Sequence, residues 1–174
     1  MIASPADILD AVYQDLHAWA RARKGICVIS SGPDNLFDLL REPPPTWRVI
    51  LHWEGDENVN TSVRAGNVAV HHYRFVVDGS VGPTAVPNIG LVRSTASRSP
   101  LLGLVNDIRA RVLGYRFPWL DTQNNHFVYE GSDDKVPLPD GLFLAAYNLL
   151  FSLPSKFQQA EEQIDLPIPE VTNG

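Results

Sequence analysis

Two segments in the middle of the chain alternate apolar and polar residues with a period of two. Residues 47–54 read WRVILHWE, and residues 68–79 read VAVHHYRFVVDG. Because successive side chains of a strand point to opposite faces, this alternation predicts two long strands that can each turn one face to a core. The polar stretch 55–67 lies between them, so we expect the two strands to pair antiparallel.

The two predicted strands divide their side chains between two faces of a sheet. One face is expected to carry Trp47, Val49, Leu51, Trp53, Ala69, His71, Tyr73, Phe75 and Val77, and the opposite face Arg48, Ile50, His52, Glu54, Val68, Val70, His72, Arg74 and Val76. The adjacent His71 and His72 therefore point in opposite directions and bind one metal ion together only if the strand bulges. His71 falls among aromatic residues and is expected to be a core or boundary histidine, whereas His72 shares its face with Arg74.

Capping signals and a three- and four-residue apolar periodicity predict a helix near the N-terminus. Ser4, Pro5 and Asp7 supply a hydroxyl cap, a proline in the first turn and an acid near the positive end of the helix dipole. The same kind of reasoning predicts a short strand at 26–31, a short helix at 33–42 and a third helix that begins at Ser99 and Pro100.

The last predicted elements are two strands around a polar turn, in residues 127–153. The second strand is apolar on both faces, so we expect it to be central, with Tyr147 in the core beside Phe75. Together these elements predict one α+β domain over residues 1–153, with a mainly antiparallel sheet and helices packed on one face. Residues 154–174 are polar and interrupted by prolines, and we expect an extended or disordered tail.

Composition excludes several classes of function. The chain has 174 residues, a net charge of −6 and a single cysteine, Cys27. One cysteine forms neither an intrachain disulfide nor a cysteine-rich zinc site, and the acidic charge argues against a general nucleic-acid binder. The sequence contains no apolar run long enough to span a membrane and no signal-peptide pattern at its N-terminus, so we expect synthesis in a reducing cytoplasm.

No catalytic motif stands out in the sequence. Cys27 lies in an apolar run and is expected to be a buried, inert thiol. A metal site made from His52, His72 and Glu54 is conceivable, because residues on neighbouring strands come within reach of each other. Paired charges on a half-solvated or subunit-facing sheet surface explain the same residues without a ligand. We therefore expect no enzyme activity, no cofactor and no metal centre in the strand pair.

The segment from Ser80 to Arg98 has no helix or strand periodicity and is too long for a hairpin turn. It nevertheless carries apolar residues that a solvated loop does not need, and the C-terminal tail does the same. The residues expected to contact other protein subunits are Val81, Val86, Ile89, Leu91, Val92, Arg93, Arg98, Phe157, Ile164 and Leu166.

Residues 127–153, FVYEGSDDKVPLPDGLFLAAYNLLFSL, resemble the closing β-hairpin of the tail terminator, or tail completion, proteins of tailed bacteriophages. In that family, which includes the tail terminator of phage lambda, a strand ending in Tyr-x-Gly leads through a polar turn into a strand of the pattern L-x-A-x-Y-x-L-x-F. The preceding helix, the long strand pair and the N-terminal helix follow the family's order, so the resemblance covers residues 4–153.

The resemblance implies a tail-terminator-like fold and a structural role in the virion. Such proteins have no catalytic residues and form a ring, commonly a homohexamer, that caps the tail tube, stops its polymerisation and offers a surface for head or neck joining. The expected partners are other copies of the chain, the tail tube protein, a sheath protein if the tail is contractile, and a head-completion or neck protein. Two alternatives remain: another head–tail connector, neck or baseplate component, and a small metal-dependent enzyme that uses His52, His72 and Glu54.

Overall fold

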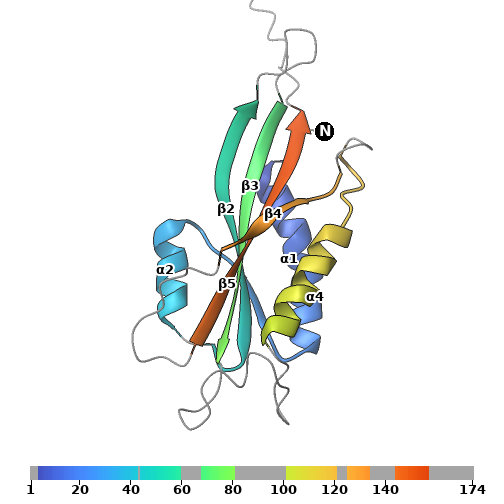
Figure 1. The fold of residues 1–174 in the computed structure, drawn as a ribbon. Coiled ribbons are helices and arrows are strands. Elements are labelled where there is room, and N and C mark those ends of the chain that lie inside the picture. Colours follow the sequence, from blue (N-terminus) through green and yellow to red (C-terminus); the bar gives the residue numbers. More distant parts are fainter. Residues whose placement is uncertain are drawn as a thin grey trace, which may run out of the picture.

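The computed structural model describes residues 4–42, 44–59, 68–80, 101–120, 125–133 and 144–156. Three helices and five strands lie in this part of the chain, in the predicted order (Figure 1). They are α1 (Pro5–Ala22), β1 (Ile26–Ile29), α2 (Pro33–Arg41), β2 (Trp47–Val59), β3 (Val68–Ser80), α4 (Leu101–Gly114), β4 (Val128–Asp133) and β5 (Leu144–Lys156). The predicted fold class is confirmed: the chain is α+β, with a mainly antiparallel sheet.

The five strands form one sheet in the order β1-β2-β3-β5-β4. β1 runs parallel to β2, and the other three neighbouring pairs are antiparallel. The predicted pairing of the two long strands is confirmed, with Val49 opposite Val77 and Leu51 opposite Phe75. β5 lies between β3 and β4, as expected for a strand that is apolar on both faces. It continues to Lys156, three residues beyond the predicted end of the domain at residue 153.

α1 and α4 cover one face of the sheet and enclose the main core (Figure 1). Ser4 and Asp7 form the reciprocal capping box that starts α1, and Asp15 of α1 accepts two hydrogen bonds of 2.6 Å from Arg111 of α4. Phe75 is fully buried in this core, whereas Tyr147 is only partly buried at its margin. The prediction of a buried aromatic is therefore confirmed in full for Phe75 and only in part for Tyr147.

Phe127 holds the centre of an aromatic cluster in this core. Its ring centroid lies 5.3 Å from that of Tyr73, 5.9 Å from Phe75, 5.3 Å from Phe117 and 5.8 Å from Phe151. Three of these contacts are edge-to-face or nearly so, an arrangement that aromatic pairs prefer. The described residues between α4 and β4, 115–120 and 125–127, thus contribute to the core although they form no helix or strand.

α2 packs on the opposite face of the sheet, so the expectation that the helices share one face holds only for α1 and α4 (Figure 1). Leu40 of α2 joins Ile50, Val76 and Ala146 in a small second core. The nine-residue α2 covers this second core.

A buried ion pair lies beside this second core. Arg48 of β2 donates hydrogen bonds of 3.1 and 2.6 Å to the carboxylate of Asp78 on β3, and a third of 2.7 Å to the backbone carbonyl of Leu39 in α2. Both side chains are almost inaccessible to solvent, at 7% and 1% exposure. Burial raises the pKa of the Asp78 carboxyl, and the hydrogen bonds and charge of Arg48 oppose that rise. The pair ties α2 to the sheet.

Cys27 of β1 is buried, as predicted, and burial raises the pKa of its thiol to about 12. None of the helices in the described ranges is long and apolar enough to cross a membrane. Hydrophobic contacts and the ion pair between α1 and α4 hold these two helices on the main core.

Replacing Gly25 by alanine is expected to lower the free energy of unfolding by about 1–3 kcal/mol, the usual range for overpacking. A Cβ atom at Gly25 would lie 2.2 Å from Cε2 of Trp47, whose indole packs edge-on against Trp19 and donates a hydrogen bond of 3.2 Å to the Arg23 carbonyl. Urea denaturation measures the change. The matched control is Gly114→Ala, where the added Cβ meets no atom within 4 Å; equal losses for the two variants would contradict the steric explanation.

Candidate functional site

The residues predicted from the sequence to contact other subunits lie outside the described ranges. This holds for the seven residues between Val81 and Arg98 and for Phe157, Ile164 and Leu166 in the tail. Within the described ranges, two surfaces have a geometry suited to binding: the sheet face next to α2, and the sheet edge formed by β1 and β2.

His71 and His72 belong to opposite faces of β3, as their alternation predicts. His71 is buried on the main-core side, and this burial lowers its pKa. His72 is half-buried on the α2 side, where its Nδ1 lies 3.3 Å from a carboxylate oxygen of Glu130 and its Nε2 lies 3.9 Å from Glu57. The two histidines are thus parts of the sheet and its surface charge pattern, and they form no joint centre.

Two short motifs of the same type flank this part of the sheet. Trp53-Glu54-Gly55 on β2 and Tyr129-Glu130-Gly131 on β4 each sit at a β-bulge. In both motifs the glycine has a positive φ, 122° at Gly55 and 144° at Gly131, which residues with a Cβ rarely adopt. In both, the glutamate beside the glycine reaches a basic residue of β3: Glu54 binds Arg74, and Glu130 contacts His72.

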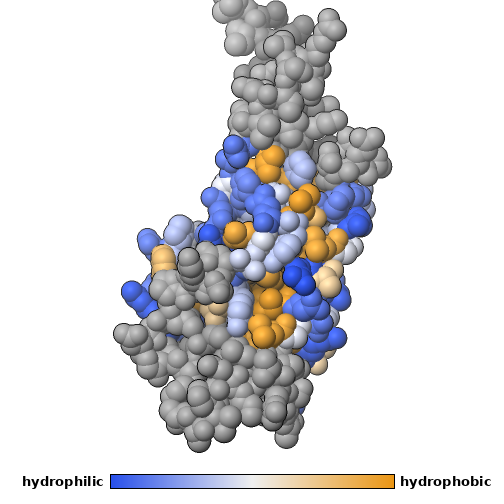
Figure 2. All heavy atoms as spheres, viewed as in Figure 1, coloured by the Kyte–Doolittle hydropathy of each residue, from blue (hydrophilic) through white to orange (hydrophobic). Residues whose placement is uncertain are grey.

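The two bulges thus create a strip of alternating charge on the α2 side of the sheet, made of Glu54, Arg74, His72, Glu130 and Glu57. α2 covers only the other end of this face, and hydrophilic residues predominate at the upper left of Figure 2, beside the upper ends of β2 and β3. The side chains of Arg74 and Glu54 are each 30% exposed, so the strip is accessible from solvent.

The conceivable metal ligands do not converge. Glu54 is engaged by Arg74, His72 faces Glu130, and His52 lies opposite Arg74 in the strand register. Within the described ranges, no three residues among His, Cys, Asp and Glu are grouped so that they could hold a metal ion. The absence of a functional metal centre stays a prediction, and elemental analysis of the purified protein tests it.

The edge of the sheet at β1 and β2 is stepped. β1 pairs with β2 only as far as Leu51, and after one more hydrogen bond of 2.8 Å, from the Ser30 N–H to the Leu51 carbonyl, the chain turns away into α2. Among the residues that the structure describes, no strand pairs with the outer edge of β2 beyond this point. A pocket of about 620 Å³ occupies the place that a longer β1 would fill; we call it the edge slot.

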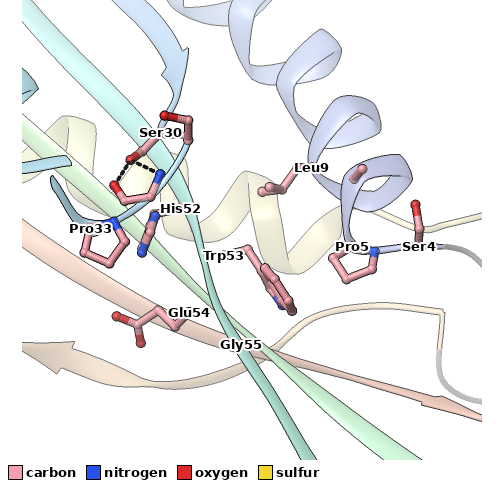
Figure 3. A pocket seen from close by; sticks show the side chains of 12 residues that line it. Ser4, Pro5, Leu9, Ser30, Pro33, His52, Trp53, Glu54 and Gly55 are labelled. Atoms are coloured by element: carbon pink, nitrogen blue, oxygen red, sulfur yellow. Dashed lines mark hydrogen bonds between the residues drawn. The ribbon is translucent and has the colours of Figure 1, made fainter. Parts of the chain in front are cut away.

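The first turns of α1, the Ser30–Pro33 turn and the β2 bulge line the edge slot (Figure 3). Trp53 lies on the α1 side, toward Leu9 and Pro5, whereas His52 lies on the side of Ser30 and Pro33. Trp53 is 39% exposed. The alternation in residues 47–54 predicts these orientations. No sequence pattern predicts the slot, because the slot depends on the position at which β1 ends.

His52 is the one buried titratable group in the lining. It is only 6% exposed, and its Nδ1 has no hydrogen-bond partner among the described residues. Burial lowers the pKa of His52 and so favours the neutral imidazole. A buried polar atom without a partner is costly. The slot is bordered by the apolar side chains of Pro5, Leu9 and Trp53, so it is suited to a ligand that brings apolar groups.

Searches against protein-family models and against curated proteins found no match for this sequence.

Proposed function

We propose that this chain is a virion structural protein of a tailed bacteriophage, which forms a ring that caps the tail tube, ends tail polymerisation and provides the surface for head or neck joining. The observation that carries the proposal is the closing hairpin. Residues 127–153 supply β4 and most of β5, which pair antiparallel, and the Tyr-x-Gly of the resemblance falls at the Tyr129–Gly131 bulge.

The order of elements supports the same proposal. An N-terminal helix, a long antiparallel strand pair, a helix and a closing hairpin follow one another as they do in the tail terminator family. A closed ring of identical subunits needs head-to-tail contacts between two different patches of the same surface. The stepped β1–β2 edge and the β4 end of the charged strip, at Glu130, lie at opposite edges of the sheet and offer two such patches.

The partners in the proposed role are other copies of the chain, the tail tube protein and a head-completion or neck protein. A homohexamer is the commonest form in the family, and a sheath protein joins the partners if the tail is contractile. Another connector, neck or baseplate component is the alternative that the same order of elements allows. The metal-dependent enzyme gains no support from the positions of His52, His72 and Glu54.

Deleting Val81–Ser97 is expected to leave a folded domain that no longer caps tails. The segment is apolar and aperiodic, and leaving its apolar area in water costs about 25 cal/mol per Å², so a neighbouring subunit or the tail tube is proposed to cover it. The measurement is the length distribution of tubes assembled in the presence of the deletion variant, by electron microscopy. Tubes should overrun their normal length.

The intact protein, added at the same concentration, is the control for this assay. Circular dichroism shows whether the variant is folded, which the assay requires. Tubes of normal and uniform length, with a folded deletion variant present, would refute the role of this segment in capping. Tubes that the intact protein also fails to limit would refute the proposed function itself.

A further inference from the structure

The outer edge of β2 beside the edge slot offers backbone hydrogen bonds as well as apolar contacts. The Ser30 N–H binds the Leu51 carbonyl, so Leu51 directs its backbone groups to this edge, and Trp53, two residues further, directs its own the same way. Exposed apolar side chains flank the step, since Ile29 is 40% and Trp53 39% exposed. An open strand edge bordered by apolar side chains is suited to the addition of an extended segment.

The sequence of the chain itself contains a segment with matching chemistry. In residues 163–169, QIDLPIP, the apolar Ile164, Leu166 and Ile168 alternate with Asp165, Pro167 and Pro169. In an extended conformation the three apolar side chains fall on one side, and Asp165 falls on the other. The segment lies outside the described residues, seven residues beyond the end of β5 at Lys156, and at about 3.3 Å per residue those seven reach about 23 Å.

The prolines fix which edge and which direction of pairing are possible. In a strand, the backbone groups of residues i and i+2 point the same way, so Pro167 and Pro169 lack their N–H on one edge only. The opposite edge keeps the donors of Ile164, Leu166 and Ile168. In an antiparallel pair, the residue opposite Trp53 exchanges backbone hydrogen bonds with it and points its side chain to the same face of the sheet. A leucine or isoleucine at that position would therefore lie against Leu9 and Pro5. In a parallel pair, Pro167 would occupy a position whose backbone N–H must donate to a carbonyl of β2, and proline has no N–H.

We propose that residues 163–169 of one copy of this chain add antiparallel to the outer edge of β2 of a neighbouring copy and fill its edge slot. Ile164, Leu166 and Ile168 pack on the α1 side, and Asp165 falls on the opposite face of the added strand. Pro167 and Pro169 remove two donors from the new outer edge, which disfavours addition of a further strand. The contact joins two different patches and therefore suits a ring; the choice of a neighbouring copy rests on the proposed function.

A mixing experiment tests this contact. One variant lacks Phe157–Gly174; a second carries Ala6→Trp, which puts a bulky side chain into the slot from an exposed position of α1. Each variant alone should be monomeric by light scattering, because one has no tail segment and the other no free slot. Mixed, they should form a one-to-one heterodimer. Ala18→Trp, at an exposed position of α1 outside the slot lining, is the matched control and should self-associate like the intact protein.

A peptide experiment tests the direction and the backbone pairing. A fluorescent peptide of residues 162–170 should bind the truncated protein, as measured by anisotropy. N-methylation of Leu166 removes a donor that faces β2 and should weaken binding by about tenfold or more. N-methylation of Asp165 removes a donor that faces away, so the affinity should stay within about threefold. Equal effects of the two methyl groups would overturn the pairing.

A mixture that stays monomeric overturns the inference, and so does a truncated protein that self-associates like the intact chain. Peptide binding without heterodimer formation would mean that the segment docks within the same copy of the chain, and this also overturns the inference. The outcomes separate this contact from the proposed function. If the truncated protein caps tubes normally, the slot contact is refuted and the proposed function stands. If the heterodimer forms but the intact protein does not cap tubes, the slot contact stands and the proposed function is refuted.

Discussion

Phe75→Ala is expected to lower the free energy of unfolding by about 3–5 kcal/mol, the range for a fully buried aromatic truncated to alanine. Phe75 has no solvent exposure and lies in β3 at the middle of the sheet, with ring centroids 5.2 Å from Phe151 and 5.9 Å from Phe127. The cavity left by the ring would be lined by these rigid aromatic neighbours, which have little freedom to collapse into it. Urea denaturation followed by circular dichroism measures the loss.

Tyr73→Phe is the matched control for this variant. Tyr73 is as buried as Phe75 and lies in the same aromatic cluster, but its hydroxyl has no hydrogen-bond partner among the described residues. Removing that hydroxyl is expected to change stability by less than about 1 kcal/mol, in the stabilising direction, because an unsatisfied buried polar group is costly. A tolerated Phe75→Ala with an unchanged unfolding midpoint would mean that the register of β2 and β3 is wrong.

The strand faces could be predicted from the sequence because one physical rule, the period of two, acts on every residue of β2 and β3. It places Val49, Leu51 and Phe75 together, and the structure does the same. The sequence analysis assigned neither Phe117 nor Phe127 to the core. Phe117 lies outside any helix or strand, where no period assigns a side chain to a face, and Phe127 precedes β4 by one residue, although both are buried.

The features of the candidate site were predictable only in part. Alternation gives the orientations of His52 and Trp53. The edge slot, however, depends on β1 ending at Ile29 and on α1 starting beside it, and both are features of the tertiary structure. The paired bulges at Gly55 and Gly131 shift the register by one residue and set Glu54 and Glu130 against β3. A glycine after a glutamate in a strand pattern can signal a bulge, but it does not tell which cation the glutamate will meet.

Asp78→Ala is expected to cost about 3–5 kcal/mol, because it leaves the Arg48 guanidinium buried without its counter-charge. The Arg48 side chain is 7% exposed and would still donate its hydrogen bond to the Leu39 carbonyl, but water cannot easily replace the lost carboxylate. Since Arg48 also holds α2 through that carbonyl, the loss should loosen α2 from the sheet. Hydrogen exchange should then report faster exchange in residues 33–41 than in α1, in addition to the lower unfolding midpoint.

A double replacement separates the cost of an unpaired charge from the value of the pair itself. Burial raises the pKa of Asp78 in spite of Arg48, which means that keeping the carboxylate ionised is itself costly in this fold. Arg48→Met combined with Asp78→Leu removes both charges. This double variant is expected to recover most of the loss, with a free energy of unfolding within about 2 kcal/mol of that of the original protein.

Glu54→Ala, which breaks the more exposed pair with Arg74 on the same face, should lower the free energy of unfolding by less than about 1 kcal/mol. If the double variant is as unstable as Asp78→Ala, the pair contributes to stability through its geometry, and the loss is not that of one stranded charge.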